Sequence, residues 1–169
     1  MARIVGAVRE PSKGSFSRDN GKPERYPPHL SKERLSNELE ALNREIDMLK
    51  PFEYQDQAEL WLHDNAHSLA VASGFEVGAN IFRDGSRWMV GNVVTNFDAG
   101  FVDIMRSGMG DRGWSWKSTW HSHGGYLSKG WWSLDQAALD RLNVNRSPKI
   151  SGRVSFFDGE NHVLSERMK

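Results

Sequence analysis

The 169-residue sequence predicts an α+β domain in which helices pack on a mixed, mostly antiparallel sheet. Apolar residues at helical spacing dominate residues 31–73, and strand-like alternation with turn signals begins near residue 75. A further helical segment after residue 133 separates the last strands from the preceding ones. The expected order is therefore two helices, a hairpin, a long loop, a strand, a helix and a terminal hairpin.

Composition narrows the classes of function. Lys plus Arg and Asp plus Glu each total 22, so no overall charge attracts the protein to nucleic acid or to an anionic membrane. The chain has no cysteine, which excludes disulfides, cysteine-based zinc sites and thiol catalysis. No apolar run is long enough for a membrane span, and residues 1–9 do not resemble a signal peptide. We expect a soluble protein that is cytoplasmic or is exported by a system independent of signal peptides.

The first 50 residues divide into an arm and a helix. Residues 1–30 hold four prolines and few apolar side chains, which predicts a flexible arm that either contacts a partner or has no role of its own. Residues 31–50 form an amphipathic helix ended by Pro51. Its seam either packs within the chain, which we favour, or pairs with a partner; the main domain follows over residues 51–169. The seam consists of Leu35, Leu39, Leu42, Ile46 and Leu49.

A second helix is expected over residues 55–73, stopped by Gly74, and it carries His63 and His67. Histidines at i and i+4 share a helical face, which is how H-E-x-x-H motifs bind zinc. Here Asp64 replaces the glutamate, and no third ligand follows at helical spacing. We interpret both histidines as partly exposed helix residues, and a metal site on this helix stays open as an alternative.

The β region begins with a hairpin. Residues 75–82 and 87–94 flank an Asp-Gly turn, and Glu76 lies near the start of the first strand. A carboxylate there is either a surface residue or a general base. Residues 95–113 form a long connection with a short helix around residues 101–105, and such connections often serve as lids or binding loops.

The main chemical signal is the pair His121 and His123. Residues at i and i+2 of a strand project from the same face, so both imidazoles can reach one point. Asp135, expected in the first turn of a helix capped by Ser133, supplies a third ligand. Two histidines and one carboxylate with an open position form the ligand set of a catalytic zinc ion, and Glu76 would be its general base. The spacing of Ser133 and Gln136 also fits a capping box, in which the serine only starts the helix.

Aromatic residues surround this pair. Trp114 and Trp116 alternate as in a buried strand, whereas Trp120, Trp131 and Trp132 are candidates for the wall of a substrate groove. The chain closes with a hairpin whose strands cover residues 150–157 and 162–164, and we interpret His162 as a surface residue.

Together these residues resemble the JAMM metalloprotease motif, in which a strand glutamate is followed by H-x-H-P, a short spacer and S-x-x-D. The chain carries it as Glu76, His121-Ser122-His123, Ser133 and Asp135. The surrounding texture is similar to bacterial JAB-like, DUF4329-type domains of polymorphic toxins and secretion-associated proteins. Shared features are an alanine-rich helix, E-x-G-x-x-I, an Asp-Gly turn and a late G-R-V strand, at residues 58–72, 76–81, 84–85 and 152–158. The likeness covers about residues 55–165.

The resemblance implies a JAB/MPN-like fold, layered like cytidine deaminases, that holds Zn²⁺ with His121, His123 and Asp135. Glu76 would act as general acid and base, and Ser133 would donate a hydrogen bond to the oxyanion. The implied activity is hydrolysis of a peptide or isopeptide bond in a protein or peptide substrate. The implied setting is a toxin or effector domain, with an immunity or delivery protein as partner.

The chain departs from the motif at two places. Gly124 stands where the motif has proline, and the spacing is S-x-D after a loop two residues longer. The shorter spacing turns Ser133 by about 100° around a helix relative to Asp135. The alternative function is a JAMM-like module that has lost catalysis and binds or scaffolds a partner, with the helix over residues 31–50 as its docking element.

Overall fold

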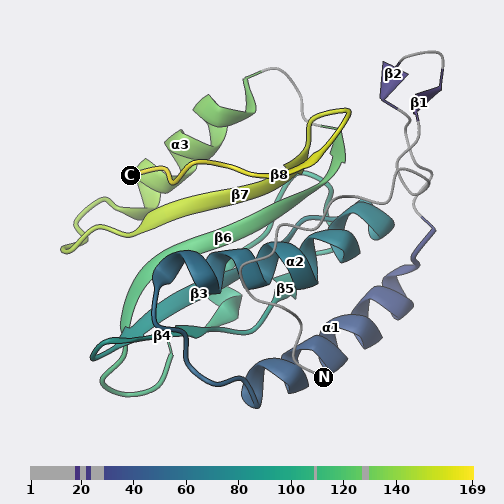
Figure 1. The fold of residues 1–169 in the computed structure, drawn as a ribbon. Helices are drawn as coiled ribbons and strands as arrows, with labels where there is room; N and C mark the ends of the chain where they lie inside the picture. The colour runs from purple at the N-terminus through teal and green to yellow at the C-terminus, as the bar shows by residue number, and fades with distance from the viewer. Residues whose placement is uncertain (1–17, 20–21, 24–28, 109, 127–129) are drawn as a thin grey trace.

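The structure is a computed structural model that describes residues 18–19, 22–23, 29–108, 110–126 and 130–169. It confirms the α+β class, because helices cover a six-stranded, mixed and mostly antiparallel sheet (Figure 1). Most of the arm predicted over residues 1–30 lies outside the described residues. Its described part contains two short strands that pair antiparallel, β1 (Arg18–Asp19) and β2 (Lys22–Pro23).

Helix α1 (Lys32–Asp47) begins at Ser31, whose side chain accepts a hydrogen bond from the Arg34 N–H at 3.2 Å. The apolar face of this helix packs within the chain, which confirms that the seam does not need a partner to cover it. The seam therefore does not form a free docking surface. Its buried residues are Leu35, Leu39, Leu42 and Ile46, and Leu49 is partly buried against them.

Helix α2 (Gln55–Ser73) ends at Gly74, as predicted, because the φ of 76° at this position favours glycine. It crosses the sheet with α1 beside it (Figure 1). Both its apolar and many of its polar side chains are buried, including His63 and His67. The expectation that these histidines are partly exposed is therefore wrong.

The six-stranded sheet has the order β4-β3-β6-β7-β8, with β5 paired to the start of β3. The hairpins β3–β4 and β7–β8 confirm the predicted hairpins. Strands β6 and β7 run parallel, so the chain crosses over between them through α3 (Trp131–Leu142). The strand bounds are β3 Val77–Asp84, β4 Arg87–Val90, β5 Val94–Thr95, β6 Ser115–Tyr126, β7 Ser151–Phe157 and β8 His162–Leu164.

Two predicted elements are displaced. The strand expected over residues 87–94 breaks after Val90, because the backbone of Val93 turns to α1, where the Asn43 side chain bonds its N–H and its carbonyl. The short helix expected over residues 101–105 is a 3₁₀ turn, η1, at Ile104–Ser107.

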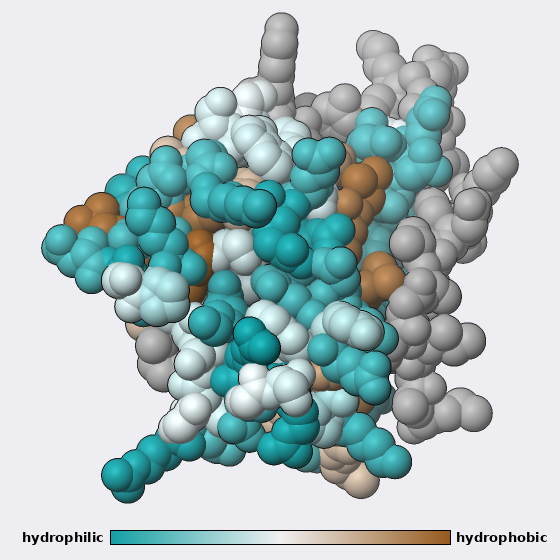
Figure 2. All heavy atoms as spheres, turned by 60° about the vertical axis from the view of Figure 1, so that its left-hand side comes forward, coloured by the Kyte–Doolittle hydropathy of each residue, from teal (hydrophilic) through white to brown (hydrophobic). Residues whose placement is uncertain are grey.

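Strand β6 has two different faces. Trp120 and Ser122 point toward α2, where they are fully buried, whereas His121 points toward a cleft beside α3. One apolar cluster lies between α1, α2 and the sheet, and a second cluster packs around Leu139 of α3. The surface drawn in Figure 2 is mainly hydrophilic, and hydrophobic residues form separate small patches on it.

Candidate metal centre

The structure brings the three predicted metal ligands together. His121 and His123 project from the same face of β6, with ring centroids 5.1 Å apart. Their Nε2 atoms lie 3.2 Å and 3.0 Å, respectively, from Oδ2 of Asp135, which α3 presents from its second turn. Between 16% and 18% of each of these three side chains is exposed, so the group is shielded yet reachable from solvent.

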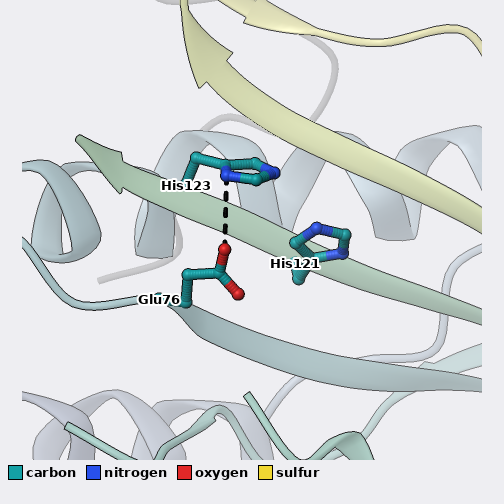
Figure 3. Close-up of side chains that lie close together, drawn as sticks. All are labelled: Glu76, His121 and His123. Carbon is teal, nitrogen blue, oxygen red and sulfur yellow. Dashed lines mark ion pairs between the residues drawn. The ribbon is translucent and has the colours of Figure 1, made fainter. Parts of the chain in front are cut away.

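Glu76 completes the cluster from the opposite side of His123. It immediately precedes β3, and its backbone is fixed on both sides: its N–H donates to the Asp98 carbonyl, and its carbonyl accepts from the Thr95 hydroxyl. Its carboxylate lies 3.2 Å from Nδ1 of His123, and the dashed line in Figure 3 marks this ion pair. One ligand atom from each of Glu76, His121 and His123 lies within 4.8 Å of the others, and among the described residues this is the only set of three with the spacing of metal ligands; Asp135 contacts both histidines without belonging to it.

The two carboxyl groups differ electrostatically. Burial raises the pKa of Glu76 to about 7; the nearby His123 opposes this shift, and Asp135 and Asp98 add to it. Burial would also raise the pKa of Asp135, but hydrogen bonds with His121 and His123 outweigh it and hold that pKa well below its usual range. Asp135 is therefore a permanent anion suited to ligation, whereas Glu76 can exchange a proton near neutral pH.

An apolar cleft of about 670 Å³ opens from this cluster. Its end is formed by Glu76, His121 and Asp135, and its two walls by the segment 100–105 and by α3. Three large apolar side chains on these walls are exposed, and our sequence analysis did not identify them: Phe101, Met105 and Leu134. Their signal in the sequence is an apolar residue within an otherwise polar loop or at an exposed helix start.

Ser133 does not join the cluster. Helix α3 begins at Trp131 with Gly130 as its N-cap, so the expected serine cap, with its Gln136 capping box, is wrong. Ser133 is exposed in the first turn, and the described lining of the cleft includes its neighbours Leu134 and Asp135 but not Ser133. The physical reason is the S-x-D spacing, because residues two apart on a helix point about 200° away from each other.

The three tryptophans proposed for a groove have different environments. Trp120 is fully buried and donates a hydrogen bond to Ser155 on the face that packs against α2, so its assignment to a groove is wrong. Period-two alternation explains this, because the residue next to His121 must face the other way. Trp131 is partly buried and packs edge-on against His123 with centroids 6.2 Å apart, and Trp132 is 39% exposed beside it.

Gly124, which replaces the proline of the motif, has a steric explanation. A Cβ atom at this position would lie 2.6 Å from the Gly74 carbonyl carbon and 2.7 Å from the Ala70 carbonyl oxygen. The strand after His123 therefore packs directly on the backbone at the end of α2, where only glycine fits.

Three other histidines, His63, His67 and His162, form a separate cluster. His63 and His67 are buried on α2, and His67 shares a hydrogen bond with His162, which is itself partly buried rather than a surface residue. Burial is the main cause that lowers the pKa of all three. Among the described residues, the only group with the spacing of metal ligands is Glu76, His121 and His123, so the structure does not favour the alternative metal site on α2.

Comparisons with known proteins do not indicate a function, so the function is argued from the geometry of the site. No known protein family, characterised protein or solved structure matches the chain. Within the described part of the chain, no helix combines the length and the apolar character needed to cross a membrane.

Proposed function

We propose that the protein is a zinc-dependent hydrolase that cleaves a peptide or isopeptide bond. His121, His123 and Asp135 would hold the ion, and Glu76 would act as the general base. One observation carries the proposal: two imidazole nitrogens converge on one carboxylate oxygen, and a second, buried carboxylate lies against the same histidine.

The donor set fits zinc. Nitrogen and oxygen donors at about 2.0–2.1 Å from a tetrahedral ion lie about 3.3 Å from one another. The separations of 3.2 Å and 3.0 Å from Asp135 to the two histidine nitrogens are close to this value, whereas the set in which all three ligand atoms lie within 4.8 Å of one another is Glu76, His121 and His123. Three protein ligands with access from a cleft are typical of catalytic zinc sites, whereas structural sites are closed by four.

The chain's own residues supply the proton transfers. A bound zinc ion provides a Lewis acid that activates water and polarises an amide carbonyl. Glu76 takes the proton of the attacking water and returns it to the leaving amine. A pKa of about 7 suits both steps, because the carboxylate accepts a proton near neutral pH and its acid form can then release it.

The cleft supports a polypeptide substrate. Its apolar walls, formed by the 100–105 segment and by α3, favour a substrate with apolar side chains next to the scissile amide. The proposal of a toxin or effector domain, with an immunity or delivery protein as partner, depends only on the resemblance of the sequence to JAB-like domains.

The test is Glu76→Gln in zinc-loaded protein incubated with a random-sequence peptide library, with cleavage mapped by mass spectrometry. We expect cleavage to fall by about 10²- to 10⁴-fold, while the zinc dissociation constant stays within about threefold. Glu166→Gln, at an exposed glutamate remote in sequence, is the matched control and should leave both unchanged.

Two other results would overturn the assignment. Loss of zinc in Glu76→Gln would identify Glu76 as a ligand, as the spacing of Glu76, His121 and His123 allows. A wild-type protein that binds zinc but cleaves nothing would favour the binding or scaffold module.

A further inference from the structure

Two buried histidines of α2 contact two paired serines of the sheet. His67 Nδ1 lies 2.5 Å from the Ser122 hydroxyl on β6, and His63 Nδ1 lies 2.8 Å from the Ser155 hydroxyl on β7. Ser122 and Ser155 are direct partners in the parallel ladder. The helix therefore crosses the sheet so that one turn of α2 matches the spacing between two strands.

The serine on β6 stands at a special position. Ser122 lies between His121 and His123, and its side chain points to the opposite face, so it reaches α2 while the two histidines reach Asp135. Regular pairing of β6 with β3 extends to Ser122, and its register with β7 becomes irregular directly after Ser122. His123 thus lies in the irregular stretch of β6 between the pairs Ser122–Ser155 and Tyr126–Phe157, where regular backbone pairing is interrupted.

The His67 ring is itself held firmly. Its Nε2 lies 2.8 Å from Nδ1 of His162, so both ring nitrogens are engaged. Burial, with the neighbouring His162, lowers the pKa of His67, so the ring is neutral at neutral pH, with one donor and one acceptor nitrogen. A ring fixed at both nitrogens cannot turn without breaking a buried hydrogen bond.

We propose that His67, acting through Ser122, is a positioning residue that holds the end of strand β6 so that His121 and His123 reach Asp135 together. This inference depends on the proposed zinc centre. His63 and Ser155 provide a matched pair within the same molecule: the same side chains make the same contact one helical turn away, but on a strand that carries no ligand.

The experiment measures the zinc dissociation constant of folded protein by competition with a chromophoric chelator. His67→Leu removes the hydrogen bond to Ser122 and should weaken zinc binding about 10-fold. This is the lower end of the losses in metal affinity found when a residue that orients the ligands, without binding the metal, is replaced. His67→Asn should restore affinity to within about threefold, because its amide occupies the position of Nδ1 beside Ser122. His63→Leu, which removes the bond to Ser155, should leave affinity unchanged.

A spectroscopic signature separates positioning from general destabilisation. The visible absorption of bound Co²⁺ reports ligand geometry, and it should change in His67→Leu but match wild type in His67→Asn and His63→Leu. Should His67→Leu fail to fold, as judged by circular dichroism, Ser122→Ala removes the same hydrogen bond and is compared with His63→Leu.

The outcomes distinguish the two claims. Wild-type protein that binds no zinc refutes the metal centre and the positioning role with it. Wild-type protein that binds zinc, together with His67→Leu or Ser122→Ala variants that bind it equally well, refutes the positioning role alone. Equal losses in the His63 and His67 variants also refute it, because they indicate destabilisation of the whole helix–sheet contact.

Discussion

Two pairs of histidines lie on opposite sides of strand β6, and their neighbours give them different chemistry. His121 and His123 face a carboxylate at the end of a cleft, whereas His63 and His67 face serine hydroxyls in a buried layer. A carboxylate beside two imidazoles stabilises a metal cation that the imidazole nitrogens bind. Buried hydroxyl groups instead stabilise the neutral form of an imidazole ring. Both pairs have same-face spacing in sequence, so the surroundings, not the spacing, decide which pair can bind a metal.

The largest effect is expected when the Asp135 carboxylate beside His121 and His123 is removed. Asp135→Asn removes the anion that both histidines contact and should weaken zinc binding by more than about 100-fold, because a direct ligand is lost. Asp140→Asn changes an exposed carboxylate on the same helix and should leave binding unchanged. Calorimetric titration of both variants checks this, and equal affinities would exclude Asp135 from the ligand set.

A second change tests how closely the strand end packs on α2. Gly124→Ala should lower the free energy of unfolding by about 1–3 kcal/mol, since its Cβ would clash with backbone atoms of α2 and Gly74. Gly100→Ala, which has room for a Cβ, should change it by less than about 0.5 kcal/mol. Urea unfolding of both variants measures the difference, and an unaffected Gly124→Ala would mean that this contact is not tight.

Low pH should destabilise the fold through His63 on α2, whose pKa is lowered. Burial, with His162 and Arg153 nearby, lowers the pKa of His63 to about 4, whereas the unfolded chain titrates near 6.5. Between these values the unfolded chain binds more protons, so stability is full above pH 6.5 and falls as the pH drops toward 4. The contribution of His63 is up to about 3 kcal/mol.

His63→Asn cannot titrate and should lose less stability than wild type between pH 7 and pH 4. Glu76, whose pKa is raised, acts in the opposite direction in both proteins, so the difference between them isolates His63. Urea unfolding at the two pH values gives this difference, and identical losses would show that His63 is not held neutral.

The smallest expected effect concerns Ser133 in the first turn of α3. Ser133→Ala should change zinc affinity and peptide cleavage by less than about twofold, because Ser133 is exposed. If the serine instead stabilised an oxyanion, cleavage would fall by about 10²- to 10³-fold. Steady-state cleavage assays of Ser133→Ala beside Ser122→Ala make the comparison direct.

Local pattern predicted most of the fold. The seam of α1, the stop at Gly74 and both hairpins follow from spacing and turn residues, which act within a few residues of the chain. The meeting of His121, His123 and Asp135 was also predicted, because strand alternation and a following helix bring them near.

Features that depend on long-range register do not follow from local pattern. The placement of Glu76 needs the backbone of Asp98 and the hydroxyl of Thr95, and the contacts of His63 and His67 need β6 and β7 to be paired at Ser122 and Ser155. Helix α3 begins after Gly130, which has a φ of 91°. The capping-box spacing of Ser133 and Gln136 predicted a later start and gave no sign of this conformation.

The most direct test of the central claim is the zinc content of purified wild type, His121→Ala/His123→Ala and His63→Asn, measured by elemental mass spectrometry. We expect about one zinc ion per chain in wild type and in His63→Asn, and none in the double variant. Zinc retained by the double variant but lost from His63→Asn would place the metal on α2 and overturn the proposed metal centre.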